Sequence, residues 1–516
     1  MTTLLDVIGS NMNENGTADT ADSSAAQLVE SSAGATPDHP SPAYLRMKPR
    51  WLRCRALMGG SDGIRAGGEL YNPRFDGETD DQLAARISLC ALTNFFARTV
   101  KACVGMLLQK RPELGQDMPT DFVDFWENVD GKGTHGAVFT KKLATDAMVD
   151  GHAGLLVDYQ RVPNASSVDA SQEKALGLRP YWVKFRAQDI FLELFEAING
   201  QQTLVLLVLR EIVEESYNRF GIRARARYRV YERTQGRVMC ELWTSAPGGG
   251  TPTQTQKPTA MLNVTEIPFE KCVAGDELTL VETRPALLDL ADLNIEHHQI
   301  KTDIRNLERL AMVPTVVRKG YVAPVDDNGD PDPAPVLLGP RQVIDVPIEG
   351  DVKWLTPDTA VLDPAMKSLE DVKLDMGTSG LSFLAPEQAR PNETAEAKRI
   401  DAAAQNASLA TFASNLQDCL EAAAGHTVAF MGLPDLEEGS ITVNTDFERA
   451  VMSPATISAL GTLAANGKLS IETLLALLER GQVLDDGFDR EAELARILKE
   501  TTLPPAAATT DTGAAA

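Results

Sequence analysis

The sequence has few of the side chains on which most enzymes and secreted proteins depend. Its 516 residues include only six cysteines and six histidines, and aromatic residues make up 6%. The cysteines are scattered and no two form a Cys-x-x-Cys pair, which favours free thiols over a disulfide or metal framework. We therefore expect reduced, mostly buried thiols at Cys54, Cys90, Cys103, Cys240, Cys272 and Cys419.

Long apolar segments are missing as well. Residues 1–9 have neither the basic stretch nor the long apolar core of a signal peptide. The longest strongly apolar run, Leu204–Leu209, has the length of a strand and is far too short to span a membrane. The sequence thus predicts a protein that is made and kept in the cytoplasm and has no membrane partner.

Positive charge is also scarce. The chain has 73 acidic and 49 basic residues, which gives a formal net charge of −24. Proteins that bind duplex DNA tightly neutralise its phosphates with lysine and arginine, so this chain as a whole is not built to grip DNA. A conduit through which DNA slides would instead benefit from a surface with little attraction for phosphate.

Recognisable catalytic motifs are absent from the sequence. There is no phosphate-binding Gly-x-x-x-x-Gly-Lys-[Ser/Thr], no His-Glu-x-x-His and no Gly-x-Ser-x-Gly, and Gly377–Gly380 has the wrong spacing for the last of these. We therefore predict that the protein is not an enzyme and binds neither a cofactor nor a metal. A cytosolic enzyme with dispersed catalytic residues would escape this search and stays open as an alternative.

Apolar periodicity predicts an α+β fold. Residues Asp80–Gln109 have helical spacing and are expected to form one long helix. Alternating segments in the middle of the chain predict strands, and Pro247–Pro258 is expected to be a mobile loop or hairpin tip. The expected strands are 153–159, 181–185, 204–214, 224–233 and 237–244. The other expected helices are 138–150, 285–311, 364–384, 394–431 with a break near Gly425, 454–466, 470–480 and 488–499.

One predicted strand carries four arginines on the same face. They alternate with small or apolar residues, so that their guanidinium groups point in one direction. The alternatives are a solvated face that is paired with acidic neighbours (Glu211, Glu214 and Glu215), or a contact with DNA or a neighbouring subunit. The four residues are Arg223, Arg225, Arg227 and Arg229.

The helix expected at 285–311 has a heptad stripe of apolar residues, which is typical of a helix that packs along a partner. His297 lies in this stripe beside His298. A metal site would need another imidazole or a carboxylate one turn away, but His297 has only Lys301 at that spacing. We therefore expect His297 to pack against a neighbouring helix.

Several stretches resemble a known family. Residues 93–100, continuing to Gln109–Pro112, resemble the early helix of tailed-phage portal proteins. Residues 150–158, which follow Val129–Gly131, are similar to a portal-like group formerly of unknown function. Further likeness, to that group and to the helical crown of portal subunits, is found in Arg179–Trp182, Ile267–Phe269, Asn466–Thr473 and Gly481–Leu484. The resemblance runs in the same order from Pro42 to about Glu500.

The resemblance implies a portal-type division of the chain into an α/β wing, a helical stem, a β-containing clip and an α-helical crown. It also implies that the loop at 383–393 is a tunnel loop whose Gln388, Arg390 and Asn392 meet DNA. The implied segments are a disordered arm at 1–41, the wing at 42–284, stem helix and clip at 285–355, a helix with the tunnel loop, a long Ala-rich helix and a return strand at 356–453, the crown at 454–502 and a disordered tail at 503–516.

The resemblance further implies a function in the virion. A portal protein forms a homo-oligomeric ring, here expected to be a dodecamer, at one capsid vertex. Its partners would be the large terminase subunit, the major capsid and scaffold proteins, a head-completion adaptor and the double-stranded DNA that passes through the channel. It would be assembled in the host bacterial cytoplasm. Another structural phage head protein is the alternative of the same general kind.

Overall fold

The computed structural model describes most of the chain. The described residues are 36–159, 177–246, 248–261, 264–312, 315–319, 351–355, 362–377, 379, 395–434, 436, 439–445, 447, 454–480, 483–484 and 488–501. The predicted arm (1–41) falls outside them except for residues 36–41, and the predicted tunnel loop (383–393) and tail (503–516) fall outside entirely. The chain divides into two units, Met1–Thr445 and Asp446–Ala516.

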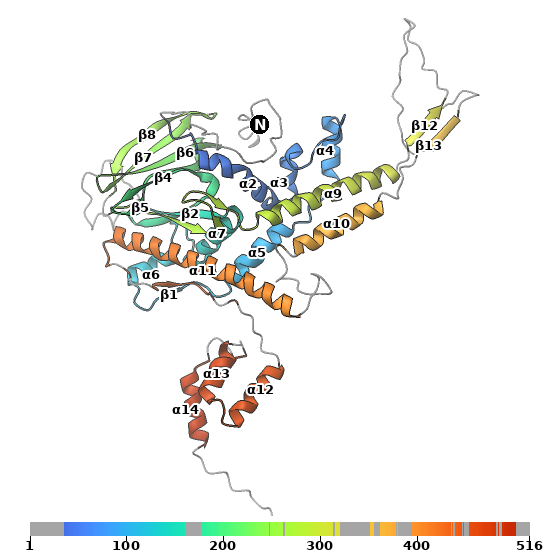
Figure 1. Ribbon diagram of the computed structural model, residues 1–516. Coiled ribbons are helices and arrows are strands. Elements are labelled where there is room, and N and C mark those ends of the chain that lie inside the picture. The colour runs from blue at the N-terminus through green and yellow to red at the C-terminus, as the bar shows by residue number, and fades with distance from the viewer. Residues whose placement is uncertain are drawn as a thin grey trace, which may run out of the picture. The chain divides into compact units, whose positions relative to one another are not determined.

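A five-stranded antiparallel sheet dominates the first unit (Figure 1). Its strands follow one another in chain order, so that each is joined to the next by a hairpin. Two of these turns place a non-glycine residue and then a glycine at positive φ, namely Asn199–Gly200 and Gln235–Gly236, as two-residue hairpins require. The strands are β4 (Ile190–Ile198), β5 (Gln201–Asn218), β6 (Gly221–Thr234), β7 (Arg237–Ala246) and β8 (Gly250–Ala260).

A three-stranded antiparallel sheet packs on one face of the five-stranded sheet. Its order is β3 (Pro180–Arg186), β2 (His152–Tyr159) and β9 (Phe269–Val273). The helices α7 (Gly136–Asp150) and α11 (Ala395–Met431) contact this smaller sheet. Between the two sheets lies an apolar core that includes Leu156, Phe185, Leu207, Leu209 and Tyr231.

Helix α2 (Pro42–Met58) covers the opposite face of the five-stranded sheet. The side chain of Ser41 caps the first turn of this helix. Pro42 follows as the first helical residue, a position where the missing backbone N–H of proline costs no hydrogen bond. Tyr44, Met47 and Trp51 pack there against β-strand residues that include Val208 and Tyr228. Neighbouring residues of β5, such as Leu207 and Val208, therefore belong to different cores, as strand alternation requires.

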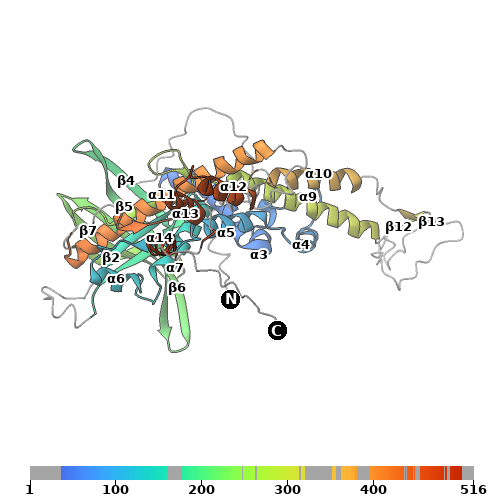
Figure 2. The same ribbon diagram turned by 90° about the horizontal axis from the view of Figure 1, so that it is seen from below.

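Two helices of the first unit run out and back. Helix α10 (Leu362–Met376) lies antiparallel along α9 (Leu288–Met312), and both views show them side by side (Figures 1 and 2). Between them in the chain come the paired strands β12 (Thr315–Lys319) and β13 (Asp351–Leu355). The buried Asn294 ties α9 to the start of α5 (Phe95–Leu107), because its Oδ1 accepts hydrogen bonds of 3.0 Å from two backbone N–H groups there.

The remaining elements of the first unit are short. They are α3 (Gly60–Ala66), η1 (Gly68–Leu70), α4 (Asp80–Ser88), α6 (Thr120–Trp126) and η2 (Ala187–Asp189), together with the strand pairs β1 (Glu113–Leu114) with β14 (Ile441–Thr442) and β10 (Asp276–Glu277) with β11 (Thr283–Arg284). The second unit contains the helices α12 (Pro454–Ala465), α13 (Ile471–Arg480) and α14 (Arg490–Thr501).

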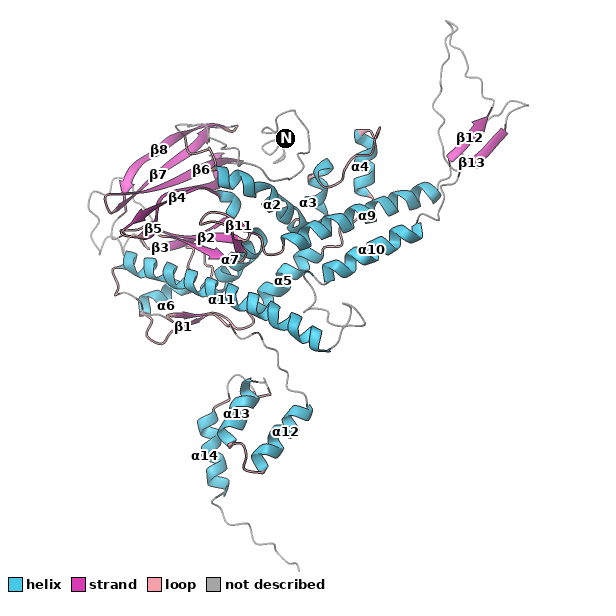
Figure 3. Ribbon diagram, in the orientation of Figure 1, coloured by secondary structure: helices cyan, strands magenta, loops and turns pink. Residues whose placement is uncertain are grey.

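The predicted α+β class is confirmed, since helices and antiparallel sheets both contribute (Figure 3). The single helix predicted at Asp80–Gln109 is wrong: α4 ends at Ser88, and α5 starts anew at Phe95. The cause is local, because the side chain of Asn94 accepts a 2.8 Å hydrogen bond from the N–H of Ala97 and so caps a new helix.

Two further expectations, a loop at Pro247–Pro258 and a helix break near Gly425, are wrong. The loop predicted at Pro247–Pro258 is largely strand β8, whose Gln254 and Gln256 pair with Trp243 and Leu242 of β7. The partner strand thus overrides the high content of proline, threonine and glycine. The break expected near Gly425 does not occur, since α11 continues unbroken to Met431.

All six cysteines are buried and none forms a disulfide, as expected. His297 also lies where the packing interpretation places it, with its ring 5.7 Å from that of Phe95 in an edge-on arrangement. Among the described residues, no group of three or more His, Cys, Asp or Glu side chains is arranged to hold a metal ion. Within the same part of the chain, no helix combines the length and the apolar character needed to cross a membrane.

His152, at the start of β2, makes the folded state sensitive to acid. Burial, with a smaller contribution from the positive charge of Lys271, lowers the pKa of its imidazole from 6.5 to about 3. Between these pH values the unfolded chain binds a proton at His152 that the folded chain does not, so stability falls as the pH falls. His152→Leu should therefore flatten the pH dependence of the free energy of unfolding by about 1.4 kcal/mol per pH unit between pH 6 and 4.

Urea denaturation of the wild type and His152→Leu at several pH values measures this difference. If the free energy of unfolding changed with pH to the same extent in both proteins, the assignment of His152 as a buried, neutral imidazole would be contradicted.

Candidate functional site

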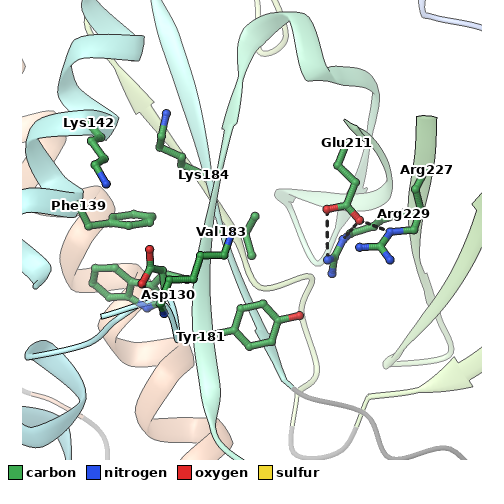
Figure 4. Close-up of a pocket in the computed structure, with 11 residues that line it drawn as sticks. Asp130, Phe139, Lys142, Tyr181, Val183, Lys184, Glu211, Arg227 and Arg229 are labelled. Carbon is green, nitrogen blue, oxygen red and sulfur yellow. Dashed lines mark hydrogen bonds and ion pairs between the residues drawn. The ribbon is translucent and has the colours of Figure 1, made fainter. Parts of the chain in front are cut away.

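A polar pocket lies where α7, β3 and β6 meet, and it has a volume of about 400 Å³. It brings together residues from the loop after α6, from α7 and from both sheets (Figure 4). Five basic and two acidic side chains contribute to its walls, which makes it locally basic in an acidic chain. The lining residues are Asp130, Lys132, Phe139, Lys142, Tyr181, Trp182, Val183, Lys184, Glu211, Arg227 and Arg229.

One wall of the pocket is a buried ion-pair network between the two sheets. Glu211 of β5 lies between the guanidinium groups of Arg227 and Arg229 (Figure 4), and the Arg229 Nε–Glu211 Oε1 distance is 2.9 Å. Arg229 also donates to Asp158 of β2, which in turn accepts a 2.8 Å hydrogen bond from the hydroxyl of Tyr181. Arg229 is 8% exposed and Asp158 is 2% exposed. The network thus joins the five-stranded sheet to the three-stranded sheet.

At neutral pH Glu211 stays ionised and Tyr181 stays protonated. Burial alone would raise the pKa of Glu211, but the guanidinium groups of Arg229 and Arg227 outweigh it and hold that pKa below its usual value. Burial and the nearby Asp158 carboxylate raise the pKa of Tyr181 to about 12. A general acid or base works best with a pKa near the working pH, so these residues are suited to holding the sheets together rather than to proton transfer.

A second buried network joins α2 to α7. Arg55 bonds to Asp150 with an Nη2–Oδ2 distance of 2.5 Å and to Asp146 with an Nη1–Oδ1 distance of 2.8 Å. Lys184, from the pocket wall, also pairs with Asp146. Burial raises the pKa of Asp150 to about 6, although Arg55 opposes this shift. Because the Asp150 side chain is fully buried and already bonded to Arg55, it cannot reach a substrate and has a structural role.

The thiols of Cys54, Cys103 and Cys419 are not reactive. Burial raises the pKa of Cys54 and of Cys103 to about 12, so both stay protonated at neutral pH. A hydrogen bond with Cys272, and after it burial, raise the pKa of the Cys419 thiol above its usual value. These thiols therefore lack the thiolate character that a nucleophile or redox site needs.

The four predicted arginines divide into two pairs. Arg227 and Arg229 lie at the base of the strand, in the network described above. Arg223 and Arg225 lie nearer the tip, where Arg225 pairs with Glu215 at 3.6 Å and Arg223 lies 4.4 Å from the ring centre of Tyr217. Of the three acidic neighbours considered, Glu211 and Glu215 share the arginine face, whereas Glu214 pairs across from Ala224 on the other face. The predicted tunnel-loop residues Gln388, Arg390 and Asn392 lie outside the described residues.

The sequence analysis did not identify Asp158, Tyr181 or Asp146 as members of these networks. No fixed spacing in the sequence links Asp158 to the arginines, because it lies 71 residues before Arg229 in the chain. The only local signal was a single carboxylate at the end of an otherwise apolar strand, which needs a buried partner.

The chain is similar to one family model and to chains of solved particle structures. The family model described as "Domain of unknown function (DUF4055)" matches residues 286–431. No curated protein sequence matches the chain. A chain of the solved structure "Virion of native gene transfer agent (GTA) particle" has a TM-score of 0.36 and 12% identity, and the match covers 81% of this chain and 98% of that one.

Two neck structures give similar values. A chain from "Neck of empty GTA particle computed with C6 symmetry" has a TM-score of 0.36 and 11% identity over 79% of this chain and 96% of that one. A chain from "Neck of native GTA particle computed with C12 symmetry" has a TM-score of 0.35 and 12% identity over 74% and 89%. At these scores the matches do not determine the function of this chain.

Proposed function

We propose that this chain is a structural protein of a phage-type head or neck and, more specifically, the portal subunit of a ring-shaped DNA channel at one capsid vertex. The observation that carries the proposal is the out-and-back path of α9, the β12–β13 pair and α10, followed by the long helix α11. The sequence resemblance implies the same succession of stem helix, clip strands, second helix and long helix. The proposal includes the division of the chain into wing, stem, clip and crown.

Electrostatics supports a conduit rather than a DNA clamp. The net charge of −24 gives DNA little reason to adhere to the protein. In the basic pocket at β3 and β6, both arginines are already paired, Arg227 with Glu211 and Arg229 with Glu211 and Asp158. A site that gripped phosphate would instead need cations free to replace the counterions of DNA.

The chemistry of the described residues supports a structural role over the enzyme alternative. Buried carboxylates pair with arginines, as Asp150 does with Arg55, and the thiols of Cys54 and Cys103 stay protonated at neutral pH. Under the proposal, Gln388, Arg390 and Asn392 face DNA. The same proposal includes the terminase, the capsid and scaffold proteins and a head-completion adaptor as partners of the ring, and the capsid vertex as its location.

Native mass spectrometry of the purified full-length chain tests the proposal. Twelve copies of the 55.8 kDa chain should give a species of about 670 kDa. A closed ring with a different number of subunits would support the portal proposal and change only the expected subunit number. A monomer or dimer at high concentration would contradict the portal proposal and favour the enzyme alternative.

A further inference from the structure

The outer half of the β5–β6 hairpin, residues 210–226, stands apart from its sheet and is called the hairpin arm below. Strand β4 pairs with β5 only as far as Leu209, and β7 pairs with β6 only from Arg227 onward. Between these points, β5 and β6 pair only with each other, out to Asn218 and Gly221. Figure 2 shows this hairpin, labelled β6, projecting beyond the neighbouring strands. Among the described strands, none pairs with either backbone edge of the arm.

The arm exposes large apolar side chains that a free surface would not favour. Ile212 is 63% exposed, Tyr217 55%, Phe220 88% and Ile222 68%. Ile212 and Ile222 lie on the same strand face as Val208 and Tyr228, which α2 buries at the base of the hairpin. Apolar residues therefore continue along this face beyond the part that helix α2 covers. Large exposed apolar side chains gathered on one hairpin are typical of a protein-binding site.

The charged residues of the arm favour a protein partner over DNA. Arg219 lies 5.1 Å from the ring centre of Phe220, and Arg223 lies over Tyr217, so cationic and aromatic groups alternate at the tip. Aromatic residues and arginine are the types most enriched at the energetic centres of protein interfaces. Arg225 is already paired with Glu215, and Glu214 adds a further negative charge that a phosphate backbone would meet.

We propose that the hairpin arm docks onto a second copy of this chain, with Phe220 and Ile222 buried in the contact and Arg219 and Arg223 facing acidic side chains of the neighbour. The charge balance favours this occupant, since the tip is basic and the chain as a whole has a net charge of −24. The inference rests on the proposed ring. An arm that binds a different surface of the next subunit makes a heterologous contact, and repetition of such contacts closes a ring.

A pair of matched double variants tests the arm. Phe220→Ser with Ile222→Ser removes the apolar tip, and Leu278→Ser with Leu280→Ser is the control. The two control residues lie between β10 and β11 and are 51% and 54% exposed. All four side chains are exposed, so neither variant should shift the midpoint of thermal unfolding of the subunit. Native mass spectrometry should show the arm variant mainly as the 55.8 kDa monomer, whereas the control should stay assembled.

A crosslinking experiment identifies the partner directly. A benzophenone side chain in place of Phe220 is irradiated in a mixture of isotopically light and heavy subunits, with and without duplex DNA. Crosslinked peptides that join a light to a heavy chain are expected. Crosslinks to DNA without any between copies would overturn the proposal.

The failures of the two proposals are distinguishable. A wild-type ring together with an intact ring of the arm variant would overturn the arm proposal and leave the portal proposal standing. A wild-type monomer would overturn both.

Discussion

Arg229→Leu should lower the free energy of unfolding by about 3–5 kcal/mol, because it breaks the buried Arg229–Asp158 ion pair from one side and leaves Glu211 with Arg227 as its partner. Arg229 is 8% exposed and donates to both Asp158 and Glu211. Asp158 is 2% exposed and also accepts a hydrogen bond from the hydroxyl of Tyr181, which carries no charge to replace that of Arg229. Leucine fills part of the space but donates no hydrogen bond and carries no charge, so the cost is that of breaking a buried ion pair from one side.

Arg225→Leu is the matched control, since it lies on the same face of the same strand. Its partner Glu215 is 47% exposed and the Nε–Oε2 distance is 3.6 Å, so its loss should cost about 0–1 kcal/mol. Urea denaturation followed by tryptophan fluorescence measures both variants under the same conditions. Equal losses for Arg225 and Arg229 would contradict the view that the network at the base of the strand joins the two sheets.

Trp182→Ala should have an effect of similar size, about 3–5 kcal/mol, because it empties the centre of an aromatic cluster. Trp182 of β3 is 1% exposed, and its ring centre lies 5.5 Å from that of Phe125, 5.8 Å from Trp126 and 5.7 Å from Phe139. Its indole N–H also donates a 2.8 Å hydrogen bond to the Thr427 hydroxyl of α11. One side chain therefore connects α6, α7, α11 and the three-stranded sheet.

Trp243→Ala is the control for the loss of an indole. Trp243 of β7 is only partly buried against the α2 side of the five-stranded sheet, and its indole N–H has no described hydrogen-bond partner. The same substitution should therefore cost clearly less free energy of unfolding in the same urea titration. A loss at Trp243 equal to or greater than that at Trp182 would contradict the central position of the Trp182 cluster.

Periodicity in the sequence was sufficient to predict the elements whose burial follows one local face. The strands at 204–214 and 224–233 were predicted because their residues alternate at the spacing of a strand. The helix at 394–431 was predicted from its alanine-rich sequence, with a break near Gly425 that the structure does not show. Strand β8 was missed because its Thr- and Gln-rich sequence becomes a strand only by pairing with β7. The boundary between α4 and α5 was missed because one side chain, Asn94, sets it.

The candidate site was predictable only in part. Strand alternation placed the four arginines on one face, and the structure agrees with that placement. The sequence alone did not indicate that this face turns inward at Arg229 and outward at Arg223. That difference depends on how far the three-stranded sheet reaches along β6, which is a tertiary contact between segments 71 residues apart.

The most direct test of the portal account is electron microscopy of the purified full-length protein. The account predicts ring-shaped particles with one central channel wide enough for duplex DNA and a closed rotational symmetry. Compact single subunits without a channel, observed at concentrations where ring proteins assemble, would contradict it.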